Sequence, residues 1–251
     1  MPKPRAIASL LVLFSLVCAG PAQAEEIIVS AAASLTNAFT TVKQRFEAAH
    51  PGATVVLNFG AAGALLRQLE SGAPVDVFVS ADQKFMDEGV AKNLIDPATR
   101  RDFARNIMVV VVPPDAKTSP ADLKALAAPG IRRIALGNPD TTPLGRDARA
   151  LFQAAGLWPA VQDKIIYGET VRQVLDYAVR GEVDAAFVFA TDAMQAGPKV
   201  RVAFQVQGAP SFLYPVAVTR MSKKLAARTF VDYLNGPEGQ ATLRGFGFLK
   251  P

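Results

Sequence analysis

The sequence predicts an α/β protein of two lobes, each a mostly parallel sheet flanked by helices, with two hinge crossings between the lobes. Short, nearly continuous apolar runs alternate with segments of helical periodicity, as in sheets that are covered on both faces. A helix–Gly–Asp–strand arrangement after Arg67-Gln68 is echoed after Arg172-Gln173, which indicates two similar lobes. Two extended segments, residues 106–112 and 211–219, lie where the chain would leave the first lobe and return to it.

Residues 1–24 have the three-part pattern of a secretory signal peptide. Lys3 and Arg5 precede an apolar stretch at residues 6–20, and small residues then lead to Glu25. We therefore expect export to the periplasm and a mature chain that begins near Glu25. The only cysteine, Cys18, would leave with this peptide, so the mature chain would contain neither a disulfide nor a thiolate metal site.

The first lobe is predicted at residues 25–105 and 214–251. Its strands are expected at 27–29, 54–57 and 76–80, where apolar residues cluster. Ser34 stands at an N-cap position before apolar residues that are spaced by three and four, and His50-Pro51-Gly52 would end that helix. Further helices are expected after the turn at 59–63, after Asp82, and as a final helix at 222–234.

The second lobe is predicted at residues 106–213. Strands are expected at 106–112, 133–136 and 185–189. Helices are expected near 121–126, at 146–155 and at 171–179, and a glycine- and proline-bearing loop occupies 137–145. Two crossings between the lobes would make a hinged clamp, which we expect to be monomeric.

Composition and motifs exclude several classes of function. Lys3 and Arg5 supply two charges of the formal net charge of +5, and no basic run marks a surface for nucleic acid. His50 is the only histidine, so a histidine-based triad or transition-metal site is nearly excluded, and no phosphate-loop or dinucleotide fingerprint occurs. Four carboxylates begin strands or helices, which is typical of capping groups: Asp76, Asp82, Asp184 and Asp192.

Helix starts that directly follow a strand and a loop recur at residues 32–34, 61–63 and 169–171. Small residues let an anion approach the backbone, and helix N-termini offer free N–H groups with a favourable dipole. Any α/β protein has such turns, so a single one means little. Their recurrence in both lobes of an exported protein favours a site for a small oxyanion.

Several blocks resemble the periplasmic molybdate-binding proteins of ABC transporters. The most specific are residues 31–38 (AAASLTNA) and 72–82 (GAPVDVFVSAD), and similar blocks occur at 137–145, 171–172, 190–193 and 214–218. The resemblance runs from about Glu25 to the C-terminus. It implies a type II periplasmic-binding-protein fold, molybdate with near-isosteric tungstate as ligand, no cofactor, and an inner-membrane ABC permease with its ATPase as partners.

The resemblance also implies a set of ligand contacts. The family holds a tetrahedral oxyanion with neutral donors only, namely two serines, a tyrosine hydroxyl and backbone N–H groups. Ser34 keeps its hydroxyl, whereas Ala62 replaces the second serine and Phe189 replaces the tyrosine, so two hydroxyls are lost. Ser34, Ala62 and Val171 would meet the metal only as contacts of the oxyanion. Carried over by position, the contacts are Ser34, Ala62, Leu144, Val171 and Phe189.

Three functions remain open at this point. The first is a molybdate receptor of an importer. The second is a receptor for a different, less polar anion, which the drier cleft around Ala62 and Phe189 favours. The third is an exported enzyme that uses carboxylates such as Asp76 or Asp192, against which the lack of histidine and cysteine argues.

Overall fold

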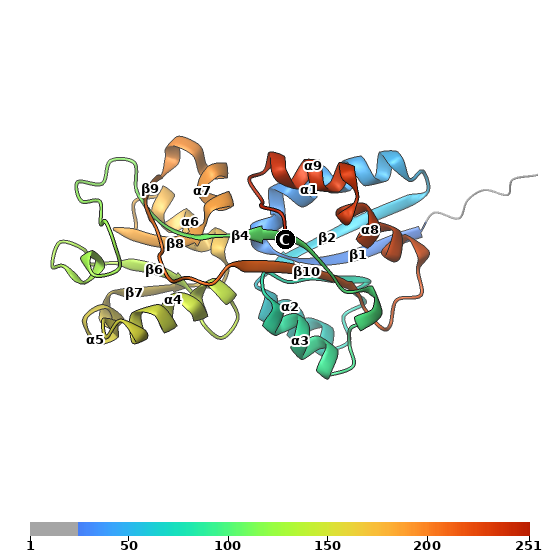
Figure 1. Cartoon of the computed structure of the whole chain (residues 1–251), viewed down its shortest axis with the longest axis horizontal. Coiled ribbons are helices and arrows are strands. Elements are labelled where there is room, and N and C mark those ends of the chain that lie inside the picture. The colour runs from blue at the N-terminus through green and yellow to red at the C-terminus, as the bar shows by residue number, and fades with distance from the viewer. Residues whose placement is uncertain (1–24) are drawn as a thin grey trace, which may run out of the picture.

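A computed structural model describes residues 25–251, so the predicted signal peptide lies outside the described residues. Two five-stranded sheets lie side by side, each with its own helices (Figure 1), and this confirms the predicted two-lobed α/β fold. The first sheet has the order β2(Ala53–Gly60), β1(Glu25–Ala32), β3(Val77–Val79), β10(Phe212–Val218), β4(Arg101–Asn106). The second has the order β7(Ile165–Gly168), β6(Ile134–Gly137), β8(Ala185–Phe189), β5(Met108–Val112), β9(Arg201–Gln205).

Each sheet contains one strand that runs against the others. β10 pairs antiparallel with β3 and β4, while β1 pairs parallel with β2 and β3. In the second sheet β5 pairs antiparallel with β8 and β9, while β6 pairs parallel with β7 and β8. The reversed strand is in both cases the one that enters the sheet from a crossing, so both sheets are mostly parallel, as predicted.

Helices cover the faces of both sheets. The first lobe, built on the first sheet, carries α1(Thr36–Ala49), α2(Ala62–Glu70), α3(Gln83–Ala91), α8(Leu225–Asn235) and α9(Pro237–Gly245). The second lobe, built on the second sheet, carries α4(Pro143–Ala154), α5(Trp158–Val161), α6(Val171–Val179) and α7(Ala190–Ala196). Single 3-10 turns occur at Ala33–Leu35, Pro97–Thr99, Ala125–Ala127, Gln162–Lys164 and Gly197–Lys199. Within residues 25–251, no helix combines the length and apolarity that crossing a membrane requires.

The first crossing differs from the prediction of one strand over 106–112. Asn106 pairs with Phe212 in the first sheet, and Met108 pairs with Phe189 in the second. Between them, the Oδ1 atom of Asn106 accepts a hydrogen bond from the backbone N–H of Ile107 at 3.0 Å. This local bond competes with the strand ladder and separates β4 from β5. The return crossing, residues 206–211, is longer.

Several further elements differ from the prediction, among them β9, β4, α9 and the helix expected at 121–126. β9 is a half-exposed edge strand, and β4 begins with two exposed residues, so neither forms a continuous apolar run. Helix α9 follows the predicted final helix after Gly236, with Pro237 at its first position, where a missing N–H costs nothing. The helix expected at 121–126 is reduced to the 3-10 turn Ala125–Ala127.

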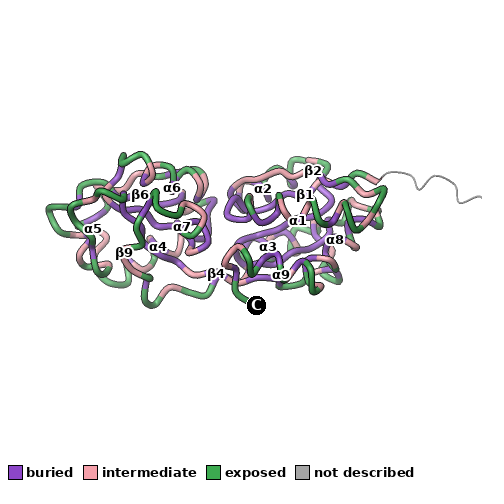
Figure 2. Tube along the Cα trace, turned by 90° about the horizontal axis from the view of Figure 1, so that it is seen from above, coloured by how far each residue is buried: buried purple, intermediate pink, exposed green. Residues whose placement is uncertain are grey.

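Aromatic rings hold each lobe together. In the first lobe Phe39 and Phe46, from α1, pack edge-on against Phe230 of α8, with ring centroids 6.1 and 5.2 Å apart. In the second lobe Phe152 packs edge-on against Phe187 at 5.5 Å. All five rings are fully buried, and the buried residues lie along the interior of each lobe (Figure 2). Each sheet is therefore a rigid base for the loops at its edge.

Candidate functional site

A pocket lies between the two lobes, where strand ends of both sheets meet helix starts. Its empty volume is about 290 Å³, including the open mouth. The lobes share the lining, and all five residues that were predicted as ligand contacts belong to it. The lining residues are Ala32, Ala33, Ser34, Gly60, Ala61, Ala62, Ala81, Thr142, Pro143, Leu144, Val171 and Phe189.

Three helices begin at this pocket with unpaired backbone N–H groups. Ala62 and Val171 are the first residues of α2 and α6, and Leu144 is the second residue of α4. The N–H groups of these positions have no acceptor inside their own helix. The preceding Thr142 and Thr170 cap α4 and α6 by accepting from residues deeper in each helix. The donors of both lobes thus converge on one space.

Glycines bring the start of α4 close to the end of β6. A Cβ atom on Gly145 would collide with the carbonyl oxygen of Gly137, and one on Gly137 would collide with the Thr142 side chain. Thr142 also donates its hydroxyl proton to the carbonyl oxygen of Asn138 at 2.7 Å. Glycine at both positions therefore sets the distance at which α4 presents Leu144 to the pocket.

The Ser34 side chain does not cap a helix, contrary to the prediction. The chain passes from β1 through the 3-10 turn Ala33–Leu35 into α1, and neither element has a side-chain cap. Instead, the Ser34 Oγ atom lies 2.9 Å from the hydroxyl oxygen of Tyr214, and both residues are buried. Burial raises the pKa of Tyr214 well above its usual range, so this phenol keeps its proton.

Sequence reasoning missed Tyr214 as a site residue. The residue belongs to β10 and lies 180 positions from Ser34, and no local pattern indicates that the two hydroxyls meet. The only signal was its place in the block 214–218, which resembles the family. In the structure this hydroxyl contacts Ser34, which lines the pocket.

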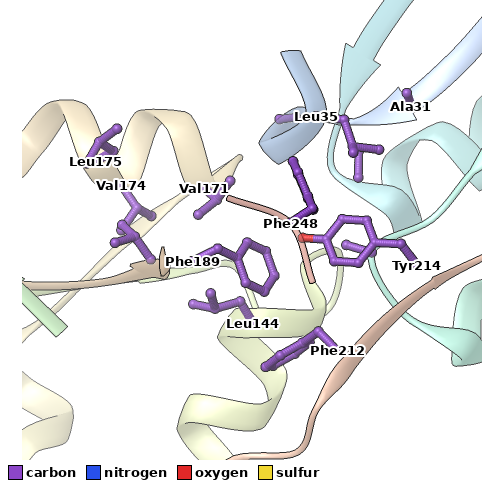
Figure 3. Packing of buried hydrophobic residues seen from close by; sticks show 14 of the residues in the cluster. Ala31, Leu35, Leu144, Val171, Val174, Leu175, Phe189, Phe212, Tyr214 and Phe248 are labelled. Carbon is purple, nitrogen blue, oxygen red and sulfur yellow. The ribbon is translucent and has the colours of Figure 1, made fainter. Parts of the chain in front are cut away.

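An aromatic wall closes the pocket at Phe189. Its ring packs edge-on against Phe212 at 5.0 Å and Tyr214 at 5.8 Å between centroids. Figure 3 shows the ring of Phe189 close to those of Phe212 and Tyr214, with Leu144 and Val171 also beside Phe189. Phe189, where the resemblance implies a tyrosine, thus adds no hydroxyl to the pocket, and its ring contacts that of Tyr214.

Two charged side chains stand directly behind the pocket wall. Arg172 of α6 donates hydrogen bonds to the carbonyl oxygens of Ala33 at 3.2 Å and Ser34 at 3.3 Å. Its Nε atom also lies 3.0 Å from Oδ1 of Asp192, in an ion pair whose alignment is too poor for a hydrogen bond. Arg172 therefore links the second lobe to the backbone of Ala33 and Ser34 in the first lobe. The sequence did not reveal this role.

The other carboxylates singled out in the sequence hold the fold together. Asp82 accepts from the N–H of Phe85 as the cap of α3, and its Oδ2 atom lies 2.7 Å from Nη1 of Arg146 in the second lobe. Asp184 accepts hydrogen bonds from two backbone N–H groups. Asp76 accepts one from a backbone N–H group, one from the Ser222 hydroxyl and one from the Lys224 ammonium group. Within residues 25–251, no cluster of three histidine, cysteine or acidic residues forms a metal site.

Comparisons with known proteins show what the whole chain is similar to. A family model of bacterial extracellular solute-binding proteins matches residues 27–249. The chain is 37% identical to the molybdate-binding protein ModA of Escherichia coli strain K12 over 246 residues, which cover 93% of each protein. It is 35% identical to ModA of Mycobacterium tuberculosis strain H37Rv, over 93% of this chain and 88% of the relative. The solved periplasmic molybdate-binding protein of Azotobacter vinelandii shares the fold, with a TM-score of 0.79, 24% identity, and coverage of 90% of this chain and 99% of that one.

Proposed function

The chain belongs to the family of bacterial extracellular solute-binding proteins, and from this premise we propose that it captures molybdate as the substrate-binding component of an ABC importer. The relatives are binding proteins of transporters, so the function is binding and not catalysis. The carboxylates that an enzyme would need, such as Asp76 and Asp192, accept hydrogen bonds from backbone N–H groups and form ion pairs. We propose Ser34, Ala62, Leu144, Val171 and Phe189 as the residues that surround the ligand.

The observation that carries the proposal is the chemistry of the pocket wall. Its lining contains no charged side chain, and it is formed by the first turns of α2, α4 and α6 together with Ser34. A dianion is stabilised by converging N–H groups and helix dipoles without a full counter-charge. Because donors come from both lobes, a bound oxyanion would join them, which supports closure of a hinged clamp around it.

Tungstate is the expected second ligand, since it presents the same tetrahedron of oxygens as molybdate. The apolar wall formed by Phe189 and Phe212 supports one alternative, namely a receptor for a less polar anion in the same pocket. Both alternatives use the same helix starts. They differ in whether the ligand has an oxygen that accepts from the Ser34 hydroxyl.

The remaining assignments follow from the same family. We propose a periplasmic, monomeric protein that delivers its ligand to an inner-membrane permease with its ATPase, after removal of residues 1–24. We also propose residues 25–105 and 214–251 as the first lobe and 106–213 as the second. Both limits cut a strand of the first sheet, because β4 ends at Asn106 and β10 begins at Phe212.

A calorimetric titration against molybdate, tungstate, sulfate and phosphate tests the proposal. We expect tight binding of molybdate and tungstate with one site per chain, and weaker binding of sulfate and phosphate. A protein that binds none of the four, or binds a larger organic anion more tightly than molybdate, would refute the molybdate assignment. A rise in melting temperature with the same ligands gives an independent measure, because binding to the folded state alone stabilises it.

A further inference from the structure

We propose that Tyr214 is a positioning residue that commits the Ser34 hydroxyl to donating into the pocket, and thereby favours oxyanions that carry no proton. The inference rests on the proposed anion-binding function. It starts from the buried contact between the two hydroxyl oxygens, which are 2.9 Å apart. Either oxygen can be the donor in this pair, and the direction decides what Ser34 offers to a ligand.

The neighbouring amide of Asn106 determines the direction. Its Oδ1 atom accepts from the N–H of Ile107 at 3.0 Å, which identifies the other amide atom as the nitrogen. That Nδ2 atom donates to Oγ1 of Thr191 at 2.8 Å and to the hydroxyl oxygen of Tyr214 at 3.4 Å. Because an amide nitrogen only donates, Tyr214 accepts here, and its single proton is left for Ser34.

The Ser34 proton then has one destination. Ser34 Oγ accepts from Tyr214, whose pKa is raised by burial so that the phenol stays protonated. Among residues 25–251, Tyr214 is the only side chain or backbone group that hydrogen-bonds to this hydroxyl. Ser34 also lines the pocket. Its own proton is therefore available to a ligand there, and the hydroxyl acts as a donor.

This arrangement is held within the first lobe. Ser34 directly follows β1, Tyr214 lies on β10, and Asn106 ends β4, and these three strands belong to one sheet. The hydroxyl is consequently oriented by the sheet and not by the approach of the second lobe. Only Thr191, at the far end of the chain of hydrogen bonds, comes from the second lobe.

A committed donor distinguishes two chemical classes of oxyanion. A tetrahedral dianion with four unprotonated oxygens can accept from Ser34 and from the N–H groups of Ala62, Leu144 and Val171. Hydrogen phosphate brings an O–H donor, which faces a wall of donors and leaves one of them without an acceptor. A buried donor without a partner is costly, so the protonated oxyanion is disfavoured. Selectivity would thus depend on Tyr214, although its hydroxyl need not touch the ligand.

The test compares Tyr214→Phe with the wild type in calorimetric titrations of molybdate and of inorganic phosphate at about pH 8, where phosphate is singly protonated. We expect the dissociation constant for molybdate to rise about fivefold to tenfold, with a smaller change for phosphate. In a Ser34→Ala background, Tyr214→Phe should add less than about twofold, since Tyr214 acts through Ser34. Tyr233→Phe is the matched control, because its ring packs against Phe46 and His50 in the first lobe, away from the pocket.

Each outcome decides the inference. An unchanged dissociation constant for molybdate in Tyr214→Phe would overturn the inference. So would an equal loss of affinity from Tyr214→Phe in the wild-type and Ser34→Ala backgrounds. In both cases the proposed function would stand. A wild type that binds neither molybdate nor phosphate would overturn both, and that result needs no variant. Asn106→Ala provides a second route, because it removes the amide that fixes the direction. This variant should bring the dissociation constants for molybdate and phosphate closer together. An unchanged ratio of the two constants would contradict the proposal.

Discussion

The Nε atom of Arg172 lies 3.0 Å from Oδ1 of Asp192, a carboxylate with no exposed surface. Burial is the largest influence on this group and raises the pKa of Asp192 to about 6, against the attraction of Arg172 and the hydrogen bond from the N–H of Phe189. The same guanidinium donates to the carbonyl oxygens of Ala33 and Ser34. One cation thus connects a buried acid of the second lobe to the pocket wall of the first.

Stability should fall as the pH rises through the titration of Asp192. Its pKa is 3.8 when unperturbed and about 6 in the fold, so the neutral acid stabilises the fold fully below the lower value and this contribution is lost as the pH passes the higher one. The difference corresponds to about 3 kcal/mol in the free energy of unfolding. Urea unfolding of the wild type and of Asp192→Asn, between about pH 3.5 and 7, measures it. Plotted against pH, the free energy of unfolding of the wild type should fall relative to that of Asp192→Asn, which has no carboxyl group to ionise at this position. Parallel curves would show that Asp192 does not titrate in this range.

Ser34→Ala should weaken molybdate binding by about 1.5–3 kcal/mol, the range for a hydrogen bond to a charged group. This is roughly a tenfold to hundredfold rise in the dissociation constant. Ser34 carries the hydroxyl that lines the pocket beside the helix starts. Ser71→Ala is the control, since Ser71 is exposed at the end of α2 in the same lobe. If Ser34→Ala bound molybdate with the wild-type dissociation constant, this hydroxyl would not be part of the site.

Restoring the two family hydroxyls should tighten binding. Ala62→Ser and Phe189→Tyr place hydroxyls on residues that line the pocket from opposite lobes. With about 1 kcal/mol or more for each bond regained, the double variant should bind molybdate about tenfold more tightly. Ala64→Ser, also on α2 but outside the pocket lining, controls for the added hydroxyl. If the double variant bound no oxyanion better than the wild type, the less polar anion would become the better assignment.

The ion pair between Arg146 and Asp82 should favour the closed form. It joins α4 to the start of α3 across the pocket at 2.7 Å, and the N–H of Gly63 donates to Thr141 in the same region. Arg146→Gln should therefore increase the radius of gyration without ligand and weaken molybdate binding about threefold to tenfold. X-ray scattering with and without saturating molybdate measures the compaction.

The control for this variant is Arg180→Gln, because the pair of Arg180 with Glu182 is exposed and lies within the second lobe. That change should alter neither the scattering nor the affinity. An unchanged radius of gyration in a wild-type sample that has demonstrably bound molybdate would contradict closure itself.

The sequence was most informative where structure is local. Alternating strands and helices, the glycine turns and the helix starts at Ala62 and Val171 could all be read from periodicity and capping. The split at Ile107 could not, because it depends on which sheet offers a partner to each half of an apolar run. Edge strand β9 lacks an apolar run because its side chains are half exposed.

The candidate site divides in the same way. The positions whose backbone N–H groups face the pocket follow from where helices begin. The resemblance identified which residues these are. The expectation that Ser34 caps a helix was wrong because its hydroxyl meets Tyr214, which lies 180 residues away in a strand that returns from the other lobe. Arg172 and Asp192 likewise meet only because α6 and α7 pack side by side. Side-chain contacts between distant segments require the fold itself.

The reversed strand β10 also bears on the order in which the chain can fold. It lies between β3 and β4 in the first sheet, so until residue 218 is available β4 has no neighbour and that sheet is open at its middle. All strands of the second sheet, in contrast, come from one continuous stretch that ends at Gln205. The second lobe can thus form before residues 206–251, which complete the first lobe, are available. A chain that emerges from its N-terminus onward would complete the inserted lobe first and the enclosing lobe last.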